Sequence, residues 1–134
     1  MDWIQENKQT MLTKKRWAVI GANTNEEKFG YKIYQILKFH GYTVWGVNPK
    51  IDAIEGEKVY PDLTSLPEKP DCISVVVPPA ISLEFVEEAG NLGIQYIWFQ
   101  PGTYNQEVLE KADSLGINPV YQDCVLVTLQ NAEV

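Results

Sequence analysis

The residues best suited to hold a phosphate group follow the first apolar segment of the chain, Trp17-Ala18-Val19-Ile20. They are Gly21, Ala22, Asn23, Asn25 and Lys28. Glycine permits a tight turn and lets a phosphate approach the backbone, asparagine accepts turn conformations and offers amide groups, and lysine adds a positive charge. The pattern indicates a phosphate-binding loop between a strand and a helix, and it also fits an ordinary turn of that kind.

This loop differs from the dinucleotide-binding fingerprint G-x-G-x-x-G. The fingerprint requires glycine at the positions of Asn23 and Glu26, so a regular dinucleotide loop is not expected. A second apolar run ends in Asn48-Pro49-Lys50, where NAD-binding sites usually have an acidic residue for the ribose hydroxyls. Lys50 favours a phosphorylated ribose instead, as in NADP or coenzyme A, unless it is only a solvated turn lysine.

A third candidate segment is the apolar stretch that contains Val77, Pro78 and Ile81. Two consecutive prolines fix the backbone before the next helix and remove its donors. The segment is therefore expected to form a rigid apolar ledge for an adenine or a pantetheine chain, or simply to begin a helix well.

These segments are positioned by a repeated pattern of an amphipathic run, a glycine and a short apolar run. Gly41, Gly93 and Gly116 each fall where a helix would end in a left-handed residue. The apolar runs are mostly continuous, as in parallel strands that are covered on both faces. They are residues 17–20, 42–47, 72–77, 96–99 and 118–121. The pattern predicts an α/β fold, a single doubly wound Rossmann-like domain with about five parallel strands and helices on both faces.

The length of 134 residues fits one domain, so residues 1–134 are expected to form it, with residues 1–13 as a leading helix. Residues 49–70 are less regular and suggest a stub of strand followed by a helical turn at residues 62–66. The ends of the strands bring the candidate segments to one edge of the sheet, which is where open parallel sheets bind ligands.

Charge and composition exclude several classes of protein. The formal net charge is -7, which argues against non-specific binding to nucleic acid or membranes, although a local basic patch or a helix N-terminus can still attract a small anion. No leader-like or membrane-spanning apolar run is present, and Cys72 and Cys124 are expected to be reduced core thiols. These features predict a cytoplasmic protein.

No catalytic or metal-binding constellation is evident in the sequence. His40, the one histidine, stands just before Gly41, where its positive charge would favour the helix dipole. Cys124 follows Asp123, whose charge opposes the formation of a thiolate. We therefore expect no catalytic residues and no metal site.

In order along the chain, the motifs VIGANTNEEKFGYKI, GYTVWGVNPK, IEGEKVYPDLTSLPEKPD, IQYIWFQPG and QDC carry a resemblance. Between about Arg16 and Cys124 the chain resembles the stand-alone bacterial CoA-binding proteins of Rossmann type. Their domain is similar to the CoA-binding domain of the succinyl-CoA synthetase alpha subunit. The resemblance implies that coenzyme A lies across the carboxyl edge of the sheet.

The resemblance also implies roles for individual residues. The phosphates would lie at Gly21, Ala22, Asn23 and Asn25, flanked by Lys28 and Tyr31. The other implied positions are Asn48, Pro49 and Lys50 at the adenosine, Val77, Pro78 and Ile81 as a wall, and Gln100 and Gly102 in a loop that faces the same cleft.

The leading functional hypothesis is a non-catalytic module that binds coenzyme A or an acyl-CoA, as a sensor, a carrier or a subunit. One alternative is an NADP-linked or acyl-transfer enzyme completed by a partner chain. Another is a Rossmann-like interaction protein without a ligand. The expected partners are this small molecule and no nucleic acid or membrane, with the protein a monomer or a homodimer.

Overall fold

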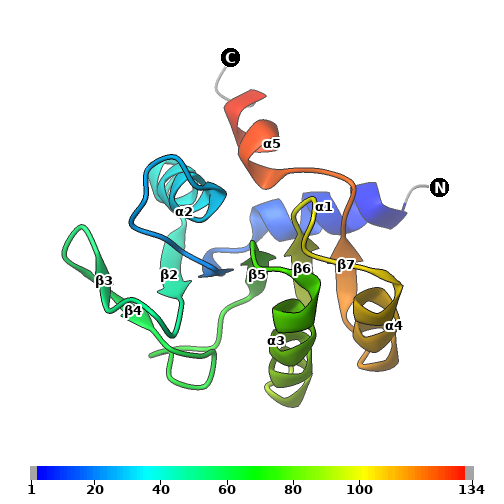
Figure 1. Cartoon of the computed structure of the whole chain (residues 1–134). Coiled ribbons are helices and arrows are strands. Elements are labelled where there is room, and N and C mark those ends of the chain that lie inside the picture. Colours follow the sequence, from blue (N-terminus) through cyan, green and yellow to red (C-terminus); the bar gives the residue numbers. More distant parts are fainter. Residues whose placement is uncertain (1–2, 132–134) are drawn as a thin grey trace.

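A seven-stranded sheet forms the centre of the computed structural model, which describes residues 3–131 (Figure 1). The strand order is β3-β4-β2-β1-β5-β6-β7. The strands are β1 (Arg16–Ile20), β2 (Thr43–Val47), β3 (Ala53–Ile54), β4 (Glu57–Tyr60), β5 (Cys72–Val75), β6 (Tyr96–Phe99) and β7 (Asn118–Val120). The helices are α1 (Trp3–Thr13), α2 (Phe29–Phe39), α3 (Pro79–Asn91), α4 (Gln106–Ser114) and α5 (Val125–Asn131).

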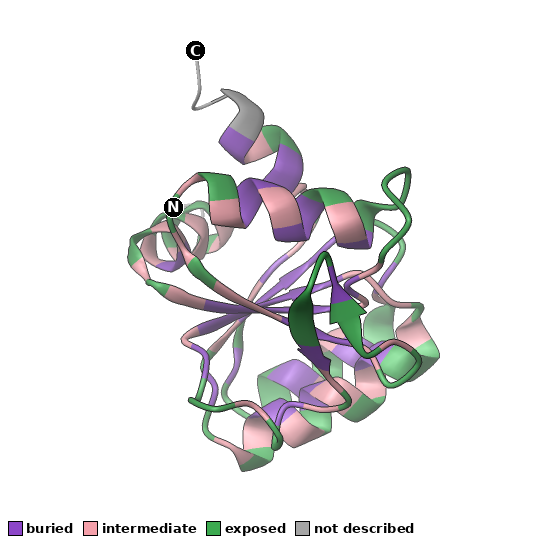
Figure 2. Cartoon of the chain, turned by 90° about the vertical axis from the view of Figure 1, so that its left-hand side faces the viewer, coloured by how far each residue is buried: buried purple, intermediate pink, exposed green. Residues whose placement is uncertain are grey.

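The sheet lies between two layers of helices, which Figure 2 shows with the buried residues turned inward. Side chains alternate along β1: Trp17 and Val19 join the core under α1, α2 and α5, while Ala18 and Ile20 join the core over α3 and α4. Each fully buried aliphatic side chain in such a core contributes about 1.5–3 kcal/mol. No helix among the described residues has the length and apolar character required to cross a bilayer.

The predicted doubly wound class is confirmed, and the five predicted strands are present and parallel. The irregular segment after residue 49 supplies more strand than the stub that the sequence indicated. Strand β4 runs parallel to β2, and β3 pairs antiparallel to β4 through a turn at Glu55 and Gly56, which both have positive φ.

Three features differ from the sequence-based predictions: the end of one strand, a helical turn and a helix. The strand expected over residues 72–77 ends at Val75, so residues 76–78 form a connecting segment at the edge of the sheet. Residues 62–66 form turns instead of a helix, because Asp62 accepts from Ser65 while Glu88 accepts from the backbone of Leu63 and Thr64. The closing helix α5 was not predicted at all.

Helix α2 begins in unusually close contact with the loop that precedes it. Its second residue, Gly30, is buried, and a Cβ added there would lie 2.0 Å from the carbonyl oxygen of Gly21 and 3.3 Å from the amide nitrogen of Asn23. A backbone carbonyl cannot rotate away as a side chain can. Only glycine therefore allows the first turn of α2 to meet the end of β1 in this way.

We expect Gly30→Ala to lower the free energy of unfolding by roughly 1–3 kcal/mol, because the added methyl group displaces backbone in a tightly packed region. Denaturant unfolding monitored by circular dichroism measures this change.

Gly90→Ala is the matched control, since Gly90 also lies within a helix. A Cβ at position 90 would lie 2.7 Å from Cδ1 of Leu115, which is the end of a flexible side chain that is 37% exposed and can shift. Alanine favours a helix over glycine by about 1 kcal/mol, so this variant should be much less destabilised. Equal losses in the two variants would contradict the backbone contact at Gly30.

Candidate functional site

The site begins at β1, where the order of the strands reverses and the carboxyl edge of the sheet opens. Gly21 directly follows this strand with φ of 96°, and its amide donates to the carbonyl of Val47 at the end of β2. A Cβ at Gly21 would lie 2.9 Å from Cγ1 of Val77 and 3.1 Å from the carbonyl oxygen of Val76. The missing side chain thus keeps open the crevice between the ends of β2 and β5.

The loop after Gly21 is held by its own asparagines. Oδ1 of Asn23 accepts from the amide of Asn25 at 2.8 Å, and Oδ1 of Asn25 accepts from the amide of Glu27 at 2.9 Å. The carbonyl of Asn25 then accepts from the amide of Lys28, just before α2. The side-chain oxygens of Asn23 and Asn25 therefore shape the loop, while their side-chain Nδ2 atoms take no part in these bonds.

Helices α2, α3 and α4 all follow strands at this edge, but their N-termini are capped differently. The N-cap residue of α4, Asn105, accepts from the amide of Val108 at 2.9 Å. Lys28 before α2 and Pro78 before α3 make no side-chain capping bond. The first amides of a helix have no carbonyl partner within it, so Phe29 and Gly30 offer donors for an anion.

Asn48 connects two loops of this edge. Its Nδ2 donates to the carbonyl of Ala22 at 3.0 Å, and its Oδ1 accepts from the amide of Lys50 at 2.9 Å. Its own amide donates to the carbonyl of Tyr60, at the end of β4. Through its side chain and backbone, Asn48 holds the loops after β1 and β2 and the end of β4 in a fixed relation.

Two adjoining cavities occupy the carboxyl edge, with volumes of about 310 Å³ and about 280 Å³. Their shared lining residues follow β1 and β5, and they are Gly21, Asn23, Val76, Val77 and Pro78. The larger cavity adds Lys28, Phe29, Gly30, Pro101, Gly102 and Thr103. The smaller one adds Ile20, Val47, Asn48, Pro49, Lys50, Ile81 and Phe85.

The charge of this lining is positive. Lys28 lines the larger cavity and Lys50 the smaller one, and among the described residues no aspartate or glutamate lines either. Both lysines are exposed, so their ammonium groups are hydrated and mobile. On a chain with a net charge of -7, this combination favours an anionic ligand locally.

Most of the residues that the sequence singled out meet at these cavities, and four do not line them: Ala22, Asn25, Tyr31 and Gln100. Ala22 is fully buried, and Asn25 acts within the loop. The hydroxyl of Tyr31 donates to Glu55 at 2.9 Å, which raises the pKa of the phenol. Tyr31 thereby joins α2 to the β3–β4 turn instead of facing the crevice.

Gln100 is buried in the core, with 3% of its surface exposed. Its Nε2 donates to the hydroxyl of Ser74 at 3.1 Å, and its Oε1 accepts from the amide of Val125 at 3.2 Å. The side chain thus joins β5 to the start of α5. The neighbouring Gly102 lines the larger cavity without it.

Several lining residues were not identified from the sequence. Gly30 was overlooked because the fingerprint fixes the spacing of its glycines, whereas here the glycine that meets the loop comes nine positions after Gly21. The apolar Phe29 and Phe85 also line the cavities, Phe29 the larger and Phe85 the smaller. Phe29 is 57% exposed.

Curated relatives match most of this chain. The acetate–CoA ligase [ADP-forming] I of Archaeoglobus fulgidus is 31% identical over 118 residues, which are 81% of this chain and 17% of the ligase. The uncharacterized protein YneT of Bacillus subtilis is 25% identical over 126 residues, 91% of this chain and 90% of YneT. The chain thus spans only a small part of the ligase and nearly all of YneT.

A solved structure with a similar fold is a hypothetical protein from Pyrococcus horikoshii OT3. It has a TM-score of 0.89 and 30% sequence identity, and the match covers 98% of this chain and 92% of that one. The family described as CoA binding domain matches residues 15–130, which include every strand and both cavities. The chain belongs to this CoA binding domain family.

Proposed function

We propose that the protein binds coenzyme A or an acyl-CoA at the carboxyl edge of its sheet and catalyses no reaction on it by itself. The observation that carries this proposal is the meeting of two cavities at the uncapped start of α2, with a lysine in each. Coenzyme A is elongated, anionic at one end and neutral along its pantetheine arm. A long crevice with separate polar and apolar parts suits such a molecule.

The residues present fit the parts of this ligand. The pyrophosphate would lie at Gly21, where a Cβ would fill the crevice, and would accept from the amides of Phe29 and Gly30. Lys50 would take the phosphate on the ribose, and the apolar Pro78 and Ile81 would contact uncharged parts of the ligand. When bound, coenzyme A supplies a thiol that carries acyl groups.

The lining chemistry supports a binding module over an enzyme. Among the described lining residues, Thr103 has the only hydroxyl, which is buried and donates to the carbonyl of Gln100. No lining histidine, cysteine or carboxylate stands beside it as a base. The name of the Archaeoglobus relative supports coenzyme A as the ligand, and that ligase has a much longer chain in which to carry out its reaction.

Isothermal titration calorimetry and native mass spectrometry with CoA, acetyl-CoA, NADP and NAD test the proposal directly. We expect one CoA or acetyl-CoA per chain, weaker NADP binding and no turnover of the acyl thioester. Preferential binding of NADP would favour the alternative of an NADP-linked enzyme completed by a partner chain. Failure of all four ligands to bind a folded protein would contradict the proposal.

We expect Lys50→Ala to weaken CoA binding about five-fold, because an exposed lysine–phosphate contact is worth about 1 kcal/mol. The same substitution should leave the affinity for dephospho-CoA unchanged, since that ligand lacks the phosphate on its ribose. Calorimetric titrations of both proteins with both ligands form a double cycle that isolates this contact.

Lys15→Ala is the control, since Lys15 is also exposed but lies before β1 at the opposite edge. It should bind both ligands as the unmodified protein does. An equal effect of Lys50→Ala on CoA and dephospho-CoA would remove Lys50 from the ribose phosphate.

We expect Asn48→Asp to weaken CoA binding about ten-fold or more. Aspartate can still accept from the amide of Lys50, but it cannot donate to the carbonyl of Ala22, which then loses its partner. Asn118→Asp, at an exposed position on β7, adds the same charge at the other edge and should leave the affinity unchanged. If Asn48→Asp retained full affinity, the Asn48 bridge would have no part in binding.

A further inference from the structure

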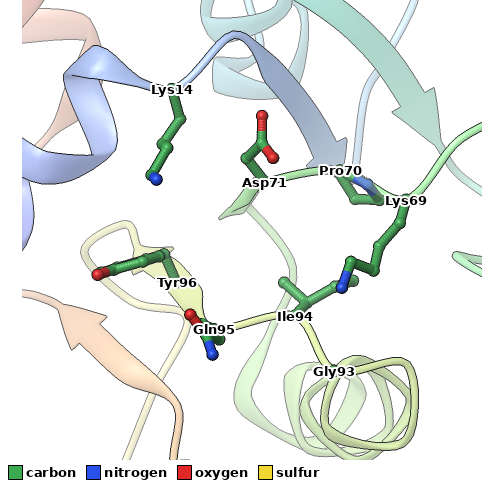
Figure 3. Close-up of a pocket in the computed structure, with 8 residues that line it drawn as sticks. All are labelled: Lys14, Lys69, Pro70, Asp71, Gly93, Ile94, Gln95 and Tyr96. Carbon is green, nitrogen blue, oxygen red and sulfur yellow. The ribbon is translucent and has the colours of Figure 1, made fainter.

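A third pocket lies at the opposite, amino edge of the sheet, away from the site proposed for coenzyme A (Figure 3). Its volume is about 200 Å³. The residues that line it come from the starts of β1, β5 and β6 and from the turn after α3, and they are Lys14, Lys69, Pro70, Asp71, Gly93, Ile94, Gln95 and Tyr96. All but Pro70 and Ile94 are partly or fully exposed.

Two lysines line this pocket from different segments of the chain, Lys14 before β1 and Lys69 before β5. Figure 3 shows the side chain of Lys14 pointing toward the Tyr96 side of the pocket and that of Lys69 toward Ile94 on the other side. Gly93 lies beside the ammonium group of Lys69, since a Cβ at position 93 would make an ordinary contact of 3.7 Å with its Nζ. Neither lysine makes an ion pair or a ring contact within the described part of the chain.

Five of the ten lysines of the protein have such a partner among the described residues, and five do not. Lys8, Lys38 and Lys111 pair with carboxylates, while Lys32 and Lys58 lie over aromatic rings. The lysines without such a partner among residues 3–131 are Lys14, Lys15, Lys28, Lys50 and Lys69. Lys28 and Lys50 line the carboxyl-edge cavities, and Lys14 and Lys69 line this pocket.

Asp71 is the one carboxylate that lines the pocket, and it already accepts hydrogen bonds from Arg16. It accepts from the amide, Nε and Nη2 of Arg16 at 3.1, 3.4 and 3.1 Å. Burial alone would raise the pKa of Asp71, but these bonds and the positive charges of Arg16 and Lys14 outweigh it and lower the pKa. Arg16 also pairs with Glu68, whose Oε1 lies 3.4 Å from Nη1. Arg16, Lys14 and Lys69 together therefore face two carboxylates, and one positive charge remains in excess.

We propose that this pocket binds a small multivalent oxyanion of the phosphate type between Lys14 and Lys69. Lysine is a good point-charge ligand for phosphate, and both lysines line the same pocket. Pockets for larger organic ligands usually measure about 300–1,000 Å³, so a cavity of about 200 Å³ suits a small ion. The site is separate from the proposed CoA site and does not depend on it.

Inorganic phosphate is the probe, and backbone amide NMR shifts are the measurement, because they report each edge of the sheet separately. We expect phosphate to shift the amides of Gly93, Gln95 and Tyr96 to saturation. The affinity at these amides should fall about ten-fold or more in the double variant Lys14→Ala with Lys69→Ala. The carbonyl of Lys14 that accepts from Trp17 belongs to the backbone, so the variant keeps that bond.

Lys15→Ala is the matched control, since Lys15 is adjacent, exposed and without an ion pair in the described chain, but does not line the pocket. It should retain the phosphate response. Chloride at equal ionic strength should give no saturable shift. Three results would each overturn the proposal: no saturable response at residues 93–96, an equal response to chloride, or an unchanged response in the double variant. Shifts confined to residues 21–30 would likewise assign phosphate to the other edge.

Discussion

The contact between Gly30 and the carbonyl of Gly21 determines the geometry of the whole carboxyl edge. Because neither residue has a side chain, the first turn of α2 meets the end of β1 directly, where an added Cβ would lie 2.0 Å from the carbonyl oxygen. The uncapped amides at the start of α2 thus lie beside the crevice between β2 and β5. Any side chain at position 30 would push the helix outward, so the shape of the crevice depends on this contact.

The capping of the helices restricts where an anion can be held. Helix α4 satisfies its own amide through Asn105, whereas α2 and α3 begin without a side-chain cap. The helix starts without a side-chain cap, those of α2 and α3, therefore lie beside β1, where the order of the strands reverses. The side chain of Asn48 bonds to Ala22 and Lys50, so it fixes the shape of this region. The attraction for an anion comes from the lysine side chains and the backbone amides.

The periodic parts of the structure could be predicted from the sequence, and the parts set by long-range contacts could not. Gly41, Gly93 and Gly116 marked the helix ends correctly because a left-handed residue is a local requirement, and all three have positive φ. The partners of Tyr31 and Gln100 lie 24 and 26 residues away, in Glu55 and Ser74, so their polar groups looked available for a ligand. The β3–β4 hairpin was under-predicted because β3 has only two residues.

Net charge alone is a poor guide to what this surface binds. In physiological salt, charges more than about 8 Å apart are largely screened, so the total of -7 acts weakly on a ligand held within a few ångströms of a lysine. What matters locally is whether the lysine has already been neutralised. Lys8 and Lys38 form ion pairs with Asp123 and Glu57 and therefore help to stabilise the fold. Lys28 and Lys50 line cavities whose described lining contains no carboxylate. An acidic protein can thus present an anion site wherever its folding leaves cations unpaired beside backbone donors.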